Sequence, residues 1–220
     1  MSKREIINKI EEEARKYFIG ASGCHDWTHV DRVRKLALSI GKKEKADLFI
    51  LEVAALLHDI GRKTEMESKG LFCHAEKSAE AAGKLLKKYK FPQDVADNIV
   101  HSVLAHRYRN QHVPTTLEAK ILFDADKLDS IGAIGVARDF LFAGNAGSNN
   151  LYTGNEKVAA KSGKDLSYTG EDSAILEYEI KLKFLKNKML TKTGKAMALD
   201  RHNYMADFFK RFWQEVKAIK

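Results

Sequence analysis

The stretch EVAALLHDIGRKTE, residues 52–65, joins an apolar run to a histidine–aspartate pair, which is followed by a glycine and two basic residues. The apolar run predicts a buried helix that ends near His58 and Asp59, and Gly61 stands where a glycine commonly terminates a helix. Adjacent residues on a helix diverge by about 100°, but at a helix end two neighbouring side chains can both turn toward one ion. The pair is therefore either an ordinary helix end or half of a metal site.

The composition narrows the class of protein. The chain has 220 residues, a formal net charge of +8, two prolines and two cysteines. So few prolines permit long helices, and no apolar run is long enough to cross a bilayer. A charged N-terminus without a signal-peptide core and too few cysteines for a disulfide framework favour a cytoplasmic protein. The positive charge suits a phosphate-bearing substrate or a nucleic acid, although lysines scattered over the surface give the same sum.

Hydrophobic periodicity predicts an all-α fold in one domain, with a helical core at about 20–142 and two long C-terminal helices within 171–219. Asp26 is the expected N-cap of the second helix and Gly41 its end, and Pro92 is expected to start the fifth. The Gly-, Asn- and Ser-rich segment 144–170 is predicted to be a flexible loop, either a lid or a disordered connection. The expected helices cover residues 3–18, 26–41, 46–59, 75–89, 92–106, 117–129, 134–141, 172–189 and 194–218.

Imidazole and carboxylate side chains recur at the ends of these helices. They are His25 and His29 at the second helix, His58 and Asp59 at the third, His74 at the fourth, His101 and His106 at the fifth, and Asp124, Asp126 and Asp129 at the sixth. Histidines and aspartates without cysteine ligands suit a divalent ion such as Mn, Fe, Co, Ni, Zn or Mg. Because Asp129 is three residues after Asp126, it shares that helix face, and we expect it to orient a ligand imidazole. Asp124 lies on a different face.

The order of these groups gives a more specific indication. The segments HDWTHVDRV (25–33), AALLHDIGR (54–62), HAEKSAEAA (74–82), SVLAHR (102–107) and ILFDADKLDSIGAIGVARDF (121–140) together resemble the HD-domain superfamily of metal-dependent phosphohydrolases. The segment MLTKTGKAMALDRHNYMADFFKRFWQEV (189–216) is similar to the C-terminal helices of the small stand-alone bacterial and archaeal members. The resemblance spans almost the whole chain and weakens only in segment 144–170.

The resemblance implies a ligand set of His29, His58, Asp59 and Asp126 for a divalent ion, with Asp59 as the catalytic residue. Such a set leaves coordination positions open for water and a phosphate oxygen. The ion then lowers the pKa of the water and polarises the phosphoryl group.

Further residues are candidates around this set. His74 and His106 stand where some members of the superfamily hold a second ion or bind phosphate, so the chain holds one ion or two. Arg62 and Lys127 are candidate phosphate-binding residues, Arg62 because its planar fork matches phosphate geometry. Each also has an ordinary interpretation as a solvated residue on a helix. His25 is expected beside the ligands in a supporting position. Gly23 and the Asp26 cap place it at or before the start of its helix, so it does not align with His29.

The expected function is hydrolysis of a phosphate ester or anhydride, with a nucleotide as the favoured substrate. Cleavage of a monoester, a diester or a pyrophosphate is left open. The alternative is a basic helical module that binds nucleic acid and keeps a metal for structure, although its lysines are spread along the chain instead of forming one block. HDWTH imitates a zinc-protease motif, but His25 and His29 do not share one helical face.

Overall fold

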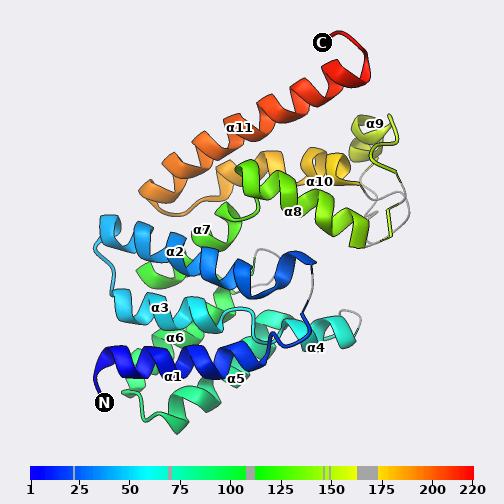
Figure 1. Ribbon diagram of the computed structural model, residues 1–220. Coiled ribbons are helices and arrows are strands. Elements are labelled where there is room, and N and C mark those ends of the chain that lie inside the picture. The colour runs from blue at the N-terminus through cyan, green and yellow to red at the C-terminus, as the bar shows by residue number, and fades with distance from the viewer. Residues whose placement is uncertain (22, 69–70, 108–111, 146, 149, 163–172) are drawn as a thin grey trace. The chain divides into compact units, whose positions relative to one another are not determined.

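The computed structural model describes residues 1–220 except 22, 69–70, 108–111, 146, 149 and 163–172 (Figure 1). Among the described residues there is no β-strand, which confirms the predicted all-α class. Nor does any helix in these ranges combine the length and apolar character needed to span a membrane. The α-helices are α1 (Lys3–Lys16), α2 (Trp27–Glu44), α3 (Leu48–Leu57), α4 (Arg62–Glu67), α5 (His74–Lys88), α6 (Gln93–Ala105), α7 (Leu117–Leu128), α8 (Gly132–Asn145), α9 (Glu156–Lys161), α10 (Ala174–Ile180) and α11 (Lys192–Val216), and two 3₁₀ helices are η1 (Gly23–His25) and η2 (Leu182–Lys188).

The chain forms two compact units. The first contains Met1–Asp126 and Leu190–Gly194, and the second contains Lys127–Met189 and Lys195–Lys220. In the second unit, α10 packs against α8, α9 and η2, and Tyr178 stacks on Phe209 with ring centroids 4.3 Å apart. That residues 1–220 act as one domain stays a prediction.

Helix α3 is the centre of the first unit. It packs against α1, α2 and α6, and Figure 1 shows it between α1 and α2. Every side chain from 53 to 57 is fully buried. A helix that is apolar on all sides is stable only when other elements surround it. The residues that directly follow α3 are therefore held in a rigid, solvent-excluded position.

Helix capping brings the predicted site residues to the ends of helices in this unit. The Asp26 carboxylate accepts hydrogen bonds from the backbone of Thr28 at 3.0 Å and His29 at 3.3 Å, which confirms the expected N-cap and fixes His29 in the first turn of α2. Pro92 is the N-cap of α6, also as predicted. His58 and His106 are the C-caps of α3 and α6, while His74 is the first residue of α5.

Both glycines that were expected to end helices serve close packing instead. Helix α2 continues past Gly41 to Glu44, and Lys45 adopts the left-handed conformation at its end. A Cβ at Gly41 would collide with the Leu51 side chain, so this glycine lets α2 approach α3. Gly61 has φ −87°, not the positive φ of a helix-ending glycine. A Cβ there would lie 2.5 Å from the carbonyl oxygen of His74 and 2.6 Å from the nitrogen of Ser78.

Two further predictions need correction. The expected helix 172–189 is broken at Lys181, whose φ of −137° and ψ of −57° lie outside helical values; α10 ends before it and η2 follows. The segment 144–170, expected to be a loop, contains α9, whose Glu156 side chain accepts a hydrogen bond from the Thr153 backbone. That bond satisfies a backbone N–H that precedes the helix. Residues 146, 149 and 163–170 lie outside the described part of the chain.

Candidate metal centre

The histidine–aspartate pair lies in the turn that follows α3. The Arg62 nitrogen donates to the Asp59 carbonyl at 3.0 Å, and the Gly61 nitrogen donates to the Ser78 hydroxyl of α5 at 2.9 Å. Both His58 and Asp59 are at most 1% exposed. The turn therefore fixes two buried polar side chains close to the start of α5.

One cluster of ligand atoms joins α2, α3 and α7. The Nε2 atom of His29 lies 3.3 Å from His58 Nε2, 3.4 Å from Asp126 Oδ1 and 3.6 Å from Asp59 Oδ2. His58 Nε2 is 3.8 Å from the same Asp59 oxygen. We call this set of four residues the first cluster; it contains the complete ligand set expected from the sequence.

A second cluster faces the other oxygen of Asp59. Asp59 Oδ1 lies 3.4 Å from His74 Nε2 and 3.5 Å from His106 Nε2, and the two imidazole nitrogens are 3.2 Å apart. Both histidines are nearly inaccessible to solvent, at 3% and 1% exposure. Asp59 thus presents one oxygen to each cluster.

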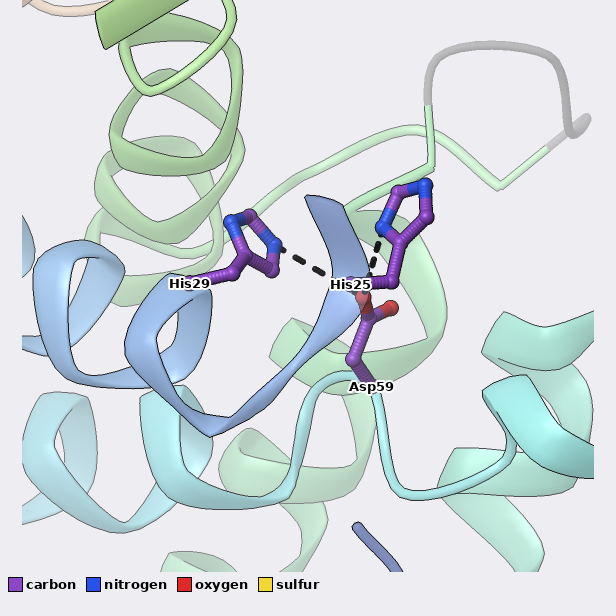
Figure 2. A group of neighbouring side chains, drawn as sticks. All are labelled: His25, His29 and Asp59. Carbon is purple, nitrogen blue, oxygen red and sulfur yellow. Dashed lines mark ion pairs between the residues drawn. The ribbon is translucent and has the colours of Figure 1, made fainter. Parts of the chain in front are cut away.

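His25 approaches the first cluster from η1. Figure 2 shows His25 and His29 on either side of the Asp59 carboxylate, and His25 Nδ1 lies 3.8 Å from Asp59 Oδ2. With its side chain 28% exposed, His25 is more accessible than the other clustered histidines. It is close enough to His29 and Asp59 to share an ion with them. The expected supporting position of His25 stays a prediction.

Hydrogen bonds on the outer side of the rings set their tautomers. His58 Nδ1 donates to the Ala55 carbonyl at 2.7 Å and His106 Nδ1 to the Val103 carbonyl at 2.5 Å. His74 Nδ1 donates to Glu65 at 2.8 Å. Because each of these acceptors carries no hydrogen, the proton must stay on Nδ1. In the neutral form of each ring, the Nε2 lone pair therefore faces the clusters.

Burial determines the charge of these groups. It lowers the pKa of His58 and of His74 to about 4, so both imidazoles are neutral at pH 7. Burial acts to raise the pKa of Asp59, but the positive charge of Arg62 and the imidazoles around the carboxylate hold it well below its usual range. Neutral imidazoles around a carboxylate that stays ionised are the protonation states that metal ligation requires.

A second shell of charged residues surrounds the clusters, and two of its members were missed from the sequence. Arg62, expected to bind phosphate, contacts both oxygens of Asp59 at 3.2 and 3.3 Å and Glu65 at 2.9 Å. Glu65 also contacts Arg107 at 2.8 Å. No role was predicted for Glu65, because it follows Asp59 by six residues in a stretch of mixed charges. Arg107 is the last residue of the segment SVLAHR, and no role was predicted for it.

Asp124 and Asp126 of α7 have different partners in the structure. Asp124 is fully buried and accepts hydrogen bonds from the Leu190 nitrogen at 2.8 Å and from the nitrogen and hydroxyl of Thr191 at 2.8 and 2.7 Å. It therefore anchors the segment before α11, while Asp126 reaches His29. Lys127 and Asp129 belong to the second unit. Lys127 is buried, and Asp129 accepts a hydrogen bond from Arg138 at 2.7 Å. Their expected roles stay predictions.

Comparison with known proteins agrees with this site. The chain matches the HD domain family model over residues 26–131, which contain both clusters but not His25. It is 29% identical to a solved HD-superfamily hydrolase from Bacillus thuringiensis. The chain belongs to the HD-domain superfamily and is a metal-dependent hydrolase of that class.

Its relatives match along nearly their whole length. The uncharacterized protein YpgQ of Bacillus subtilis is 35% identical over 202 residues, which cover 90% of this chain and 87% of YpgQ. The crystal structure of YpgQ in complex with ADP has a TM-score of 0.74 and covers 98% of this chain and 97% of that one. The HD-superfamily hydrolase from Bacillus thuringiensis has a TM-score of 0.72, with 99% and 100% covered.

Proposed function

We propose that this protein hydrolyses a phosphate ester or anhydride of a nucleotide, using one divalent ion in the first cluster and a second ion in the second cluster. The observation that carries the proposal is the convergence of acceptor atoms in the second cluster. His74 and His106 both use Nδ1 as the donor, so their two Nε2 lone pairs face each other at 3.2 Å. The ionised Asp59 Oδ1 lies within 3.5 Å of both.

Such a set of atoms fits a divalent ion. Three acceptor atoms at this separation repel one another, and a cation between them turns the repulsion into attraction. Ligand atoms that surround an ion at about 2.1 Å lie about 3.0 to 3.4 Å apart, close to the separations in both clusters. A proton on His74 is disfavoured at neutral pH, because burial lowers its pKa to about 4. The donor chemistry is also the nitrogen and oxygen set that borderline divalent metals prefer.

Different residues would take different roles in such a reaction. An ion in the first cluster would be held by His29, His58 and Asp126, and an ion in the second by His74 and His106. Asp59 would contribute one oxygen to each cluster. Bound there, a divalent ion lowers the pKa of a water ligand and polarises a phosphoryl oxygen. Arg62 keeps Asp59 ionised, and its guanidinium is partly exposed.

The nucleotide part of the proposal has two supports. The related YpgQ has been crystallised in complex with ADP, and the net charge of +8 favours an anionic substrate. The presence of Cys24 and Cys73 as thiols supports the expected cytoplasmic location. Loss of a terminal phosphate, opening of a diester and release of pyrophosphate are three outcomes that one assay separates.

The metal content tests the first half of the proposal. Protein purified without a chelator is analysed by inductively coupled plasma mass spectrometry, and we expect one or two divalent ions per chain. Asp126→Asn should lower the content of the first cluster, His74→Ala that of the second, and Asp59→Ala both. Protein that carries no divalent ion and that none activates would refute the mechanism.

A substrate screen tests the second half. A panel of nucleotides is incubated with and without Mn²⁺, and the products are identified as phosphate, pyrophosphate or nucleoside. Asp59→Ala should abolish turnover, whereas Asp31→Asn, which alters a half-exposed aspartate on α2, should leave it unchanged. If the wild-type protein is inactive on every nucleotide but binds nucleic acid tightly and in a salt-sensitive way, the binding-module alternative holds.

A further inference from the structure

Glu65 uses both carboxylate oxygens to connect three elements around the second cluster. Oε2 accepts from His74 Nδ1 at 2.8 Å and from Arg62 Nη1 at 2.9 Å, and Oε1 pairs with Arg107 Nη1 at 2.8 Å. The Glu65 side chain is only 13% exposed. Its partners come from α4 itself, from the start of α5 and from the residue that follows the C-cap of α6. Glu65 thus links three side chains that lie on the outer side of the second cluster.

The contact with His74 differs from the outer contacts of His58 and His106. His58 and His106 donate Nδ1–H to neutral backbone carbonyls, whereas His74 donates to a carboxylate. A charged acceptor fixes the ring orientation as a carbonyl does, and it also increases the electron density that Nε2 offers to an ion. Of these three histidines, His74 is therefore the one whose strength as a ligand depends on a side chain that can be replaced.

The contact with Arg62 protects the shared carboxylate. Arg62 is divided between Glu65 and Asp59, and its Nη2 lies 3.2 Å from Asp59 Oδ1, which faces the second cluster, and 3.3 Å from Oδ2. Without the charge of Glu65, the guanidinium would be attracted to Asp59 alone and would compete with an ion for the lone pairs of Oδ1. The first cluster is affected less, because the ring of its His58 donates its outer hydrogen bond to the Ala55 carbonyl and not to Glu65.

We propose that Glu65 is a positioning residue that sets the affinity of the second cluster for its divalent ion, through His74 and Arg62. The proposal rests on the proposed function, since it presumes that the clusters bind metal. Glu65 does not touch the ion. It acts by orienting one ligand and by drawing a competing cation away from another.

The test is Mn²⁺ binding to the full-length protein, measured by equilibrium dialysis together with electron paramagnetic resonance of free Mn²⁺. Glu65→Gln keeps the size of the side chain and one oxygen acceptor but removes the charge. We expect the class of site that His74→Ala removes to lose about 10- to 100-fold in affinity, the range found for residues that support metal ligands. The other class should stay within about twofold. The matched control is Glu67→Gln, whose exposed side chain lies on the same helix, 4.0 Å from Lys63.

The possible results separate this proposal from the one on which it rests. If the wild-type protein binds no Mn²⁺, the proposed function fails and Glu65 loses its role with it. If the wild-type protein binds Mn²⁺ and Glu65→Gln leaves all affinities within about twofold, or weakens both classes equally, the positioning role is wrong while the proposed function stands. Circular dichroism of the metal-free variant checks its fold. Should it fail to fold, Glu65→Asp, which keeps the charge but shortens the reach, is measured in the same way with the same unequal loss expected.

Discussion

Replacing Gly61 by alanine tests whether the turn that carries His58 and Asp59 is set by packing or by backbone conformation. At φ −87° an alanine fits the backbone without strain, so conformation alone predicts a gain of about 0.4 to 1 kcal/mol from the reduced freedom of the unfolded chain. Packing predicts the opposite sign. The added Cβ would meet the His74 carbonyl oxygen at 2.5 Å and the Ser78 nitrogen at 2.6 Å.

The atoms that obstruct this Cβ decide the magnitude. They are backbone atoms in the first turns of α5, which cannot rotate away as a flexible side chain would. Overpacking of this kind destabilises a protein by about 1 to 3 kcal/mol. The reduced conformational freedom of the unfolded chain offsets part of this loss. We expect Gly61→Ala to destabilise the protein by about 2 kcal/mol, which for a chain of this size lowers the melting temperature by about 4 to 8 °C.

The assay is urea unfolding of the metal-free protein, followed by circular dichroism, with Mn²⁺ affinity as a second measurement. Because the substitution pushes the turn away from the start of α5, the cluster that contains His74 should also bind Mn²⁺ more weakly. The control is Gly83→Ala in α5, where a Cβ would meet only the Val100 side chain at an ordinary 3.9 Å. That change should be neutral or stabilising by about 0.5 to 1 kcal/mol. If Gly61→Ala is as stable as Gly83→Ala, the packing explanation is refuted.

Three other perturbations have expected outcomes. Asp124→Ala should lower the free energy of unfolding in urea by about 3 kcal/mol, because it leaves the buried donors before α11 unsatisfied. Asp126→Ala should change the stability of the metal-free protein by less than about 1 kcal/mol and mainly reduce its metal content. Equal losses of stability in the two variants would contradict these separate roles. Burial lowers the pKa of His58 and His74 to about 4 from 6.5, so the unfolded state takes up protons first as the pH falls, and metal-free protein should lose up to about 3 kcal/mol per histidine between about pH 6.5 and 4. A flat stability profile across that window would show that the imidazoles are not buried in their neutral form. Removal of the ion with EDTA should lower the melting temperature, since an ion at 100 times its dissociation constant stabilises the native state by about 2.7 kcal/mol; an unchanged melting temperature at saturating Mn²⁺ would argue against a native-state site.

Much of the architecture follows from local sequence rules. The apolar periodicity depends on neighbouring residues within one helix, so it predicted the longer helices of the first unit closely, although not the short helix α4. Asp26 as a cap and Pro92 as a start were likewise local and were confirmed. The break at Lys181 and helix α9 were not predicted, because no proline marks the first and because glycines and asparagines around the second favour turns.

The sequence by itself determined the chemistry of this protein: buried helices that end in histidine and aspartate, in an order that belongs to one superfamily of hydrolases. Only the tertiary structure decided how those groups meet. It gave one oxygen of Asp59 to each cluster, joined His74 to His106 across 32 positions, and brought Glu65 and Arg107 behind them. It also changed the role of Gly61 from the end of a helix to a point of contact with α5. The physical reason is that periodicity specifies which face of a helix is apolar. Distances between atoms of different helices depend on how those faces pack, and a single Cβ is enough to alter them.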